Sequence, residues 1–170
     1  MTLITIEEAK SLGRPLGDIK GEKLTSYIKE VENTQIKPSL GDALFKDLQD
    51  PDKKEEDPLS TLLNGGEYKD GSGVFRSFAG LKVAISYFVY VKILMSGDLE
   101  STRYGFVEKQ GMYSQHLSTA ARSAAYNEAM EVAQHYLNEC VAFCKDKDLI
   151  DRKNIRRGVT SGGCTIKKIG

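Results

Sequence analysis

One segment of this chain is apolar on nearly every side, and it limits the possible folds more than any other feature. It runs from about Phe78 to Met95 and fits helical spacing. A helix of this kind is buried in a core, shared with another subunit, or inserted in a membrane. Its roughly 17 residues from Ala79 onward lie at the lower limit for a membrane span, and Lys82 and Lys92 interrupt it. We therefore predict a core helix that also contacts a neighbouring subunit, and no membrane partner.

A second long helical pattern runs from about Tyr113 to Lys145 and is apolar along one face. Alanine dominates its first half, and small side chains allow neighbouring helices to approach closely. Residues 96–111 join the two helices, and a connection of this length inside a compact domain is usually functional or disordered. Its aromatic and apolar residues Tyr104, Phe106 and Val107 favour a strand-like arm or a plug against a partner.

The first half of the chain predicts shorter helices. Thr5-Ile-Glu-Glu has the pattern of a capping box at the start of a helix over 6–11. Further apolar stripes predict helices over 21–35, 38–48 and 58–63, with Pro38 forcing a break between the first two of these. Asp70-Gly71, flanked by strand-forming residues, predicts a β-hairpin. The fold class is therefore mainly α, a helical bundle with a small β-hairpin flap and an extended C-terminal arm.

The charges balance over the whole chain but not locally. There are 24 basic and 24 acidic residues, so global charge favours neither nucleic acid nor an anionic membrane. Residues 42–57 are predominantly acidic and predict a solvated loop from Gln49 to Asp57, whereas residues 151–170 are predominantly basic. We divide the chain into a helical domain, 1–150, and a basic arm, 151–170. The arm either is solvated or forms salt bridges to a neighbouring subunit, or it neutralises phosphates through Arg152, Lys153, Arg156 and Arg157.

No pattern in the sequence predicts catalysis, a metal site or a cofactor. The only histidines are His116 and His135, and Cys140 and Cys144 fall short of the four ligands that a structural zinc site needs. We expect these two cysteines to be small core residues, and the odd total of three cysteines favours a reducing compartment. We expect no enzyme activity, since no nucleophile and base are paired.

Two stretches carry a resemblance to a known family. The first is Ile36-Lys-Pro-Ser-Leu-Gly-Asp-Ala-Leu-Phe-Lys-Asp-Leu, and the second is Thr102-Arg-Tyr-Gly-Phe-Val-Glu-Lys-Gln-Gly-Met-Tyr-Ser. They resemble the head-to-tail connector proteins, also called adaptor or ring proteins, of tailed bacteriophages, including crAss-like and other Bacteroidetes phages. The order of the predicted elements agrees as well. The resemblance spans about Ile6 to Lys145 and leaves out the basic arm.

The resemblance implies a virion structural protein that catalyses nothing. Such proteins are assembled in the host bacterial cytoplasm into a homo-oligomeric ring, usually twelve-fold, at the head–tail interface below the portal protein. The ring extends the channel through which genomic DNA passes without sequence-specific contact, and it docks tail or second-ring components. We expect contacts with a neighbouring subunit or the portal from nine residues of the connection and the arm: Arg103, Tyr104, Phe106, Val107, Lys109, Arg152, Lys153, Arg156 and Arg157. The alternative is a small helical binding module that contacts nucleic acid through its basic tail.

Overall fold

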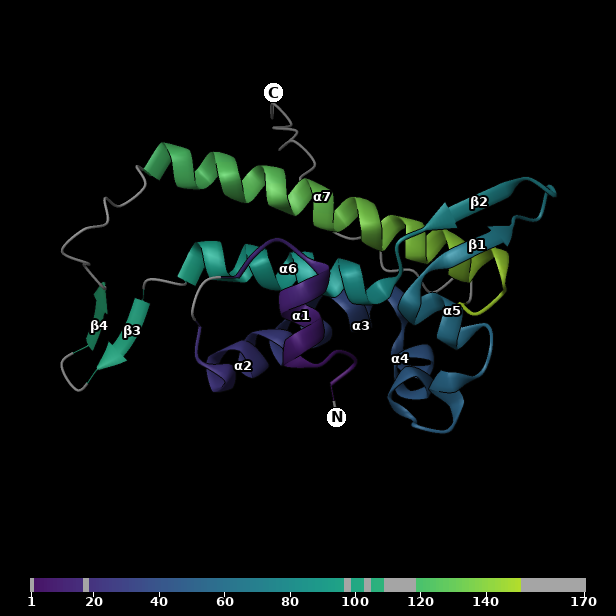
Figure 1. The fold of residues 1–170 in the computed structure, drawn as a ribbon, viewed down its shortest axis with the longest axis horizontal. Coiled ribbons are helices and arrows are strands. Elements are labelled where there is room, and N and C mark those ends of the chain that lie inside the picture. The colour runs from purple at the N-terminus through teal and green to yellow at the C-terminus, as the bar shows by residue number, and fades with distance from the viewer. Residues whose placement is uncertain (1, 17–18, 97–98, 103–104, 109–118, 151–170) are drawn as a thin grey trace, which may run out of the picture.

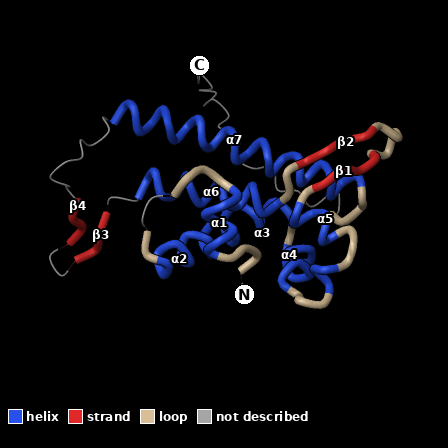
Figure 2. Tube along the Cα trace, viewed as in Figure 1, coloured by secondary structure: helices blue, strands red, loops and turns tan. Residues whose placement is uncertain are grey.

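The computed structural model describes residues 2–16, 19–96, 99–102, 105–108 and 119–150. These residues form a helical body with two small β-hairpins (Figure 1). In chain order the elements are α1 (Ile6–Leu12), α2 (Gly21–Val31), the π-helical turn η1 (Glu32–Ile36), α3 (Lys37–Leu40), α4 (Asp42–Gln49), the 3₁₀ turn η2 (Lys53–Glu55), α5 (Leu59–Asn64), β1 (Gly66–Lys69), β2 (Phe75–Phe78), α6 (Leu81–Ser96), β3 (Leu99–Thr102), β4 (Gly105–Glu108) and α7 (Thr119–Asp146). The predicted fold class, mainly α with a small hairpin, is confirmed, and Figure 2 shows how far helix outweighs strand. The predicted arm, 151–170, lies outside the described residues.

Helix α6 is the centre of the body. Helix α7 runs along one side of it, and α1 and α2 pack on another side (Figure 1). Leu81, Ala84, Ile85 and Val89 are completely buried. Another face of α6, which includes Val83, Tyr87, Tyr90 and Leu94, is half-buried. There Tyr87 packs on Tyr136 of α7, with ring centroids 5.1 Å apart. No described helix is both long and apolar enough to cross a membrane. Its buried face makes the apolar segment a core helix, as predicted, although it starts at Leu81 and Phe78 belongs to β2. The predicted contact of this helix with a neighbouring subunit stays a prediction.

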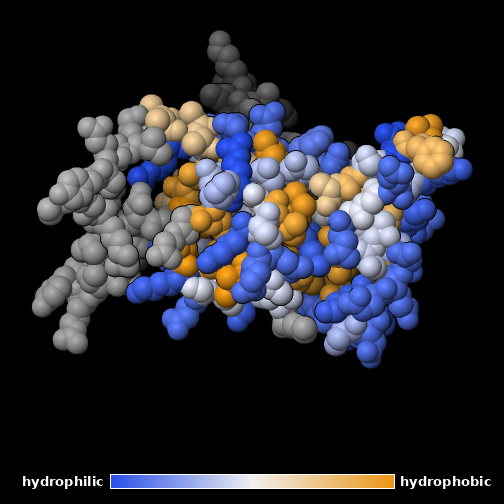
Figure 3. All heavy atoms as spheres, in the orientation of Figure 1, coloured by the Kyte–Doolittle hydropathy of each residue, from blue (hydrophilic) through white to orange (hydrophobic). Residues whose placement is uncertain are grey.

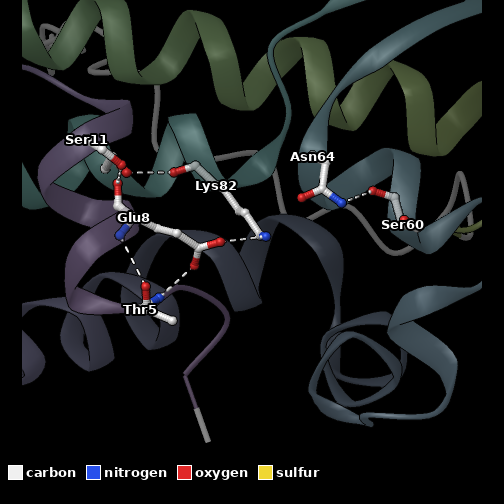
Figure 4. A network of polar contacts seen from close by, with 7 residues as sticks. Thr5, Glu8, Ser11, Ser60, Asn64 and Lys82 are labelled. Atoms are coloured by element: carbon white, nitrogen blue, oxygen red, sulfur yellow. Dashed lines mark hydrogen bonds and ion pairs between the residues drawn. The ribbon is translucent and has the colours of Figure 1, made fainter.

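Helix α1 is fixed at its N-terminus by the predicted capping box. The Thr5 hydroxyl accepts the backbone N–H of Glu8 at 3.1 Å, and the Glu8 carboxylate accepts the backbone N–H of Thr5 at 2.8 Å. The second carboxylate oxygen of Glu8 accepts a hydrogen bond from the Lys82 ammonium at 2.7 Å (Figure 4). The Glu8 carboxylate thus completes the N-terminal cap of α1 and also joins this helix to α6.

The predicted break at Pro38 is wrong. Lys37, the residue before it, is helical, and α2 continues through η1 into α3 before the chain turns at Gly41, where φ is 87°. At the end of η1 the backbone N–H of Lys37 bonds to the carbonyl of Glu32, five residues back. This wider turn comes immediately before the proline, at the position where a regular α-helix would clash with the ring. Gly41 supplies the actual break, because its backbone conformation favours glycine.

The hairpin predicted at Asp70-Gly71 is confirmed as the antiparallel pair β1–β2, with Tyr68 opposite Arg76. A second antiparallel pair, β3–β4, lies in the connection after α6, where a strand-like arm was predicted. The two hairpins lie at opposite ends of the helical body (Figure 1). The predicted start of the last helix, residues 113–118, lies outside the described residues.

Candidate functional site

The β1–β2 hairpin has a turn built around one aspartate. Oδ1 of Asp70 accepts the backbone N–H groups of Ser72 and Val74, both at 2.9 Å, and Oδ2 accepts Nε–H of Arg76 at 2.7 Å. Gly73 has φ 79° and donates its N–H to the Asp70 carbonyl at 2.8 Å. The hydrogen bond from Arg76 lowers the pKa of Asp70, so the carboxylate is charged and accepts all three bonds at neutral pH. The turn therefore has a defined shape.

This turn presents two apolar side chains to solvent. Val74 is 54% exposed and Phe75 is 71% exposed. The ammonium of Lys69 lies 4.6 Å from the centre of the Phe75 ring, within the range of a cation–π contact. Figure 3 shows apolar side chains at this end of the molecule, beside polar ones. We call Val74 and Phe75 the hairpin tip.

The base of the hairpin is anchored in the core by three aromatic rings. The Phe78 ring stacks on the Phe143 ring of α7, with the ring centroids 4.8 Å apart. The Tyr68 ring packs against both in a T-shaped arrangement, with its centroid 5.0 Å from that of Phe143 and 5.7 Å from that of Phe78. All three residues are buried. Aromatic pairs in this geometry stabilise by about 1 kcal/mol beyond the area they bury. The exposed tip is thus joined to a rigid base.

Two glycines allow the segment before β1 and the segment after β2 to approach closely at the base of the hairpin. Gly65 and Gly80 both have positive φ, 80° and 93°. A Cβ on Gly65 would lie 2.5 Å from the carbonyl carbon of Ala79, and a Cβ on Gly80 would collide with the backbone of Gly65 and Asn64. Only glycine satisfies both the backbone conformation and the close approach. These positions fix the angle at which the hairpin leaves α5 and enters α6.

A groove of about 700 Å³ lies elsewhere on the body, beside the chain break at Gly41. Its walls come from α3, the start of α4 and the residues that follow α7. The lining is Asn33, Lys37, Pro38, Leu40, Gly41, Asp42, Ala43, Leu44, Leu149 and Ile150. It is apolar on its floor, and at its rim the ammonium of Lys37 lies 3.1 Å from the Asp42 carboxylate. This groove includes much of the 36–48 stretch on which the family resemblance depends.

Of the nine residues predicted to contact partners, the structure describes two. Phe106 and Val107 lie in β4, where they pair with Ser101 and Glu100 of β3. Arg103, Tyr104 and Lys109 in the connection, and Arg152, Lys153, Arg156 and Arg157 in the arm, lie outside the described residues. The sequence reasoning did not select Val74 and Phe75, although an apolar pair directly after a predicted tight turn is a signal for an exposed tip.

The described part of the chain holds neither a metal-binding cluster nor a readily ionised thiol. Within it, no three histidine, cysteine or acidic side chains are grouped so that they could hold a metal ion. Cys140 and Cys144 are completely buried, and burial raises the pKa of both thiols, that of Cys144 to about 12. They are core residues, as predicted, and too poorly ionised to act as nucleophiles.

The chain matches a protein family over much of its length. A family model described as a family of unknown function, DUF6712, matches residues 36–149, more than half of the chain. No curated protein matches the chain, and neither does any solved structure. The matched span starts in η1, includes both hairpins and ends at the groove residue Leu149.

Proposed function

The chain belongs to DUF6712, a family of unknown function, and from the chain's own features we propose that it is a subunit of a bacteriophage head-to-tail connector. In this role it assembles into a ring below the portal protein, extends the DNA channel and docks tail components in the virion. It is a structural protein, and its contacts with DNA are not sequence-specific. The resemblance of the 36–48 and 102–114 stretches to connector proteins motivates the proposal.

The observation that supports it most is the hairpin tip. Neighbouring exposed apolar side chains mark contact sites on protein surfaces more reliably than singly scattered ones do. Asp70 fixes the turn, and the rings of Phe78 and Phe143 fix the base, so little conformational freedom remains to be lost when Val74 and Phe75 are buried. A preorganised apolar tip of this kind suits insertion into a neighbouring copy.

The positions of the two hairpins support cyclic assembly in particular. A closed ring requires heterologous contacts, in which each copy uses two different surfaces. The β1–β2 and β3–β4 hairpins lie at opposite ends of the body and differ in sequence, so one copy can offer a different element to each neighbour (Figure 1). Phe106 and Val107, which we propose as contact residues, belong to the second hairpin.

Native mass spectrometry and negative-stain electron microscopy test the proposal. The protein is measured alone and together with the portal protein of the same phage. We expect rings, either in isolation or on the portal. In the double variant Val74→Ser/Phe75→Ser assembly is lost while the circular dichroism spectrum and melting temperature stay the same, because both side chains are exposed in the single subunit.

Ser72→Ala is the matched control, since Ser72 is exposed in the same turn and uses only its backbone N–H there. It should assemble like the unmodified protein. A protein that stays monomeric and does not bind the portal would contradict the connector role. A tip variant that assembles normally would show that the hairpin tip is not the contact.

A further inference from the structure

The groove beside Gly41 lies where the chain leaves the helical body. Helix α7 ends at Asp146, and Asp148 takes a left-handed conformation with φ 52°. The backbone N–H of Leu149 then bonds to the carbonyl of Cys144 at 2.9 Å, which closes a Schellman-type helix end. This turn directs Leu149 and Ile150 back to α3 and α4, where both line the groove. Ile150, the last residue that the structure describes before the arm, therefore lies at the groove itself.

The segments 42–57 and 151–170, which both begin next to the groove residues, carry opposite charges. The segment 42–57 starts at the groove and contains seven acidic against three basic residues. The segment 151–170 contains six basic residues against one acidic residue. Asp42 remains accessible at the rim, with its side chain 86% exposed despite the ion pair with Lys37. Asp52 and Glu55 in the following loop are exposed as well.

We propose that residues 151–170 of the same chain dock in this groove and along the acidic 42–57 segment. Ile155, between two basic pairs, faces the apolar floor formed by residues such as Leu40 and Leu44, and the flanking arginines and lysines face the acidic side chains. Five extended residues beyond Ile150 reach roughly 17 Å, enough to cross a groove of this size. Attachment at the groove gives the arm a high effective concentration there, which favours its own groove over that of another molecule.

Docking of the arm decides whether its basic residues form salt bridges within the protein or bind phosphates. Arginines and lysines paired with the 42–57 acids are not free to neutralise phosphates, so the arm acts as an intramolecular contact and not as a nucleic-acid binder. The contact is independent of ring formation. It therefore stands or falls separately from the connector role.

Zero-length cross-linking of the full chain tests this directly. A carbodiimide joins a carboxylate to an amine only where the two are in contact, and mass spectrometry identifies the joined peptides. The experiment uses an equal mixture of ¹⁴N- and ¹⁵N-labelled chains. We expect Lys153, Lys167 or Lys168 joined to acids of 42–57, in pairs of equal isotope label only, with a yield that falls as salt screens the charges.

A charge-reversed arm provides the matched comparison. Arg156→Glu/Arg157→Glu keeps every lysine and every acid that could cross-link, and the yield should fall severalfold. The control Lys10→Glu/Lys20→Glu changes net charge equally at exposed sites outside the groove and should leave the yield unchanged. Mixed-label pairs, cross-links to Glu22 and Glu131 as frequent as those to 42–57, or equal yields in the two variants would each overturn the proposal.

Discussion

The backbone N–H of Leu3 donates a hydrogen bond to the carboxylate of Glu32 across 2.6 Å, 29 residues along the chain. Glu32 lies in the π-helical turn η1 and is only 2% exposed. The buried Glu32 side chain therefore fixes the segment before α1 to this turn. Burial raises the pKa of Glu32 to about 7, and the backbone hydrogen bonds from Leu3 and Ile4 oppose this effect only partly.

The raised pKa predicts that stability falls with increasing pH. Between the ordinary value of 4.5 and about 7 the folded protein binds more protons at Glu32 than the unfolded chain does. The contribution of this group is therefore complete below pH 4.5 and is lost as pH rises through 7, by up to about 3 kcal/mol. Denaturant unfolding at several pH values should show this decrease in the unmodified protein and a smaller decrease in Glu32→Gln, which cannot ionise. Identical pH profiles for the two proteins would contradict the assignment.

Because Gly65 and Gly80 approach so closely at the base of the hairpin, we expect a single added methyl group to lower the free energy of unfolding strongly. Gly80→Ala adds a Cβ that collides with the backbone of Gly65 and Asn64, at a φ of 93° that alanine rarely adopts. We expect several kcal/mol of destabilisation, at the upper end of the effects of single substitutions. Chemical denaturation monitored by circular dichroism measures it.

Gly71→Ala is the control for this substitution. A Cβ there meets no atom within 4 Å, and the backbone is not in the left-handed region. Its free energy of unfolding should differ from that of the unmodified protein by at most about 0.5 kcal/mol. If the two variants are equally stable, the close crossing of Gly65 and Gly80 does not constrain the fold.

Local signals account for what the sequence predicted correctly. The capping box at Thr5 and the turn at Asp70-Gly71 depend on residues a few positions apart, and the all-round apolar pattern of α6 is complete within its own segment. Pro38 also gave a local signal, but a π-turn overrode it. That turn is stabilised partly by Glu32, whose partner Leu3 is far away in the sequence.

The candidate site was harder to predict because its parts come from distant segments. The groove brings residues near 40 together with Leu149 and Ile150, over 100 positions later, and no spacing rule links them. The hairpin was predicted, but the exposure of Val74 and Phe75 depends on Phe143 of α7 covering only the base of the strands. Exposure at one end of a hairpin follows from packing at the other end, which a one-dimensional pattern does not contain.

The double use of Glu8 leads to a prediction about helix α1. Burial alone would raise the pKa of Glu8, but the hydrogen bonds from Lys82 and Thr5 outweigh it and lower the pKa. Thr5→Ala removes the acceptor for the Glu8 N–H and should cost about 1 kcal/mol of unfolding free energy. Ser26→Ala, at an exposed position within α2, should be neutral or slightly stabilising because alanine is the better helix former. Equal stability of the two variants would exclude a role for the cap.

The buried thiols predict a reactivity pattern that reports on the core of α7. Cys140 and Cys144 are inaccessible, and their raised pKa values leave almost no thiolate at pH 8. Iodoacetamide should leave both unmodified in the native protein and should alkylate both in denaturant, as peptide mass spectrometry will show. Phe143→Ala, which removes the buried ring next to Cys144 in the sequence and leaves a cavity, should destabilise the protein by about 3–5 kcal/mol and speed alkylation of both cysteines through unfolding. Rapid alkylation of either cysteine in the unmodified native protein would mean that this part of α7 opens far more readily than its packing against Tyr68 and Phe78 implies.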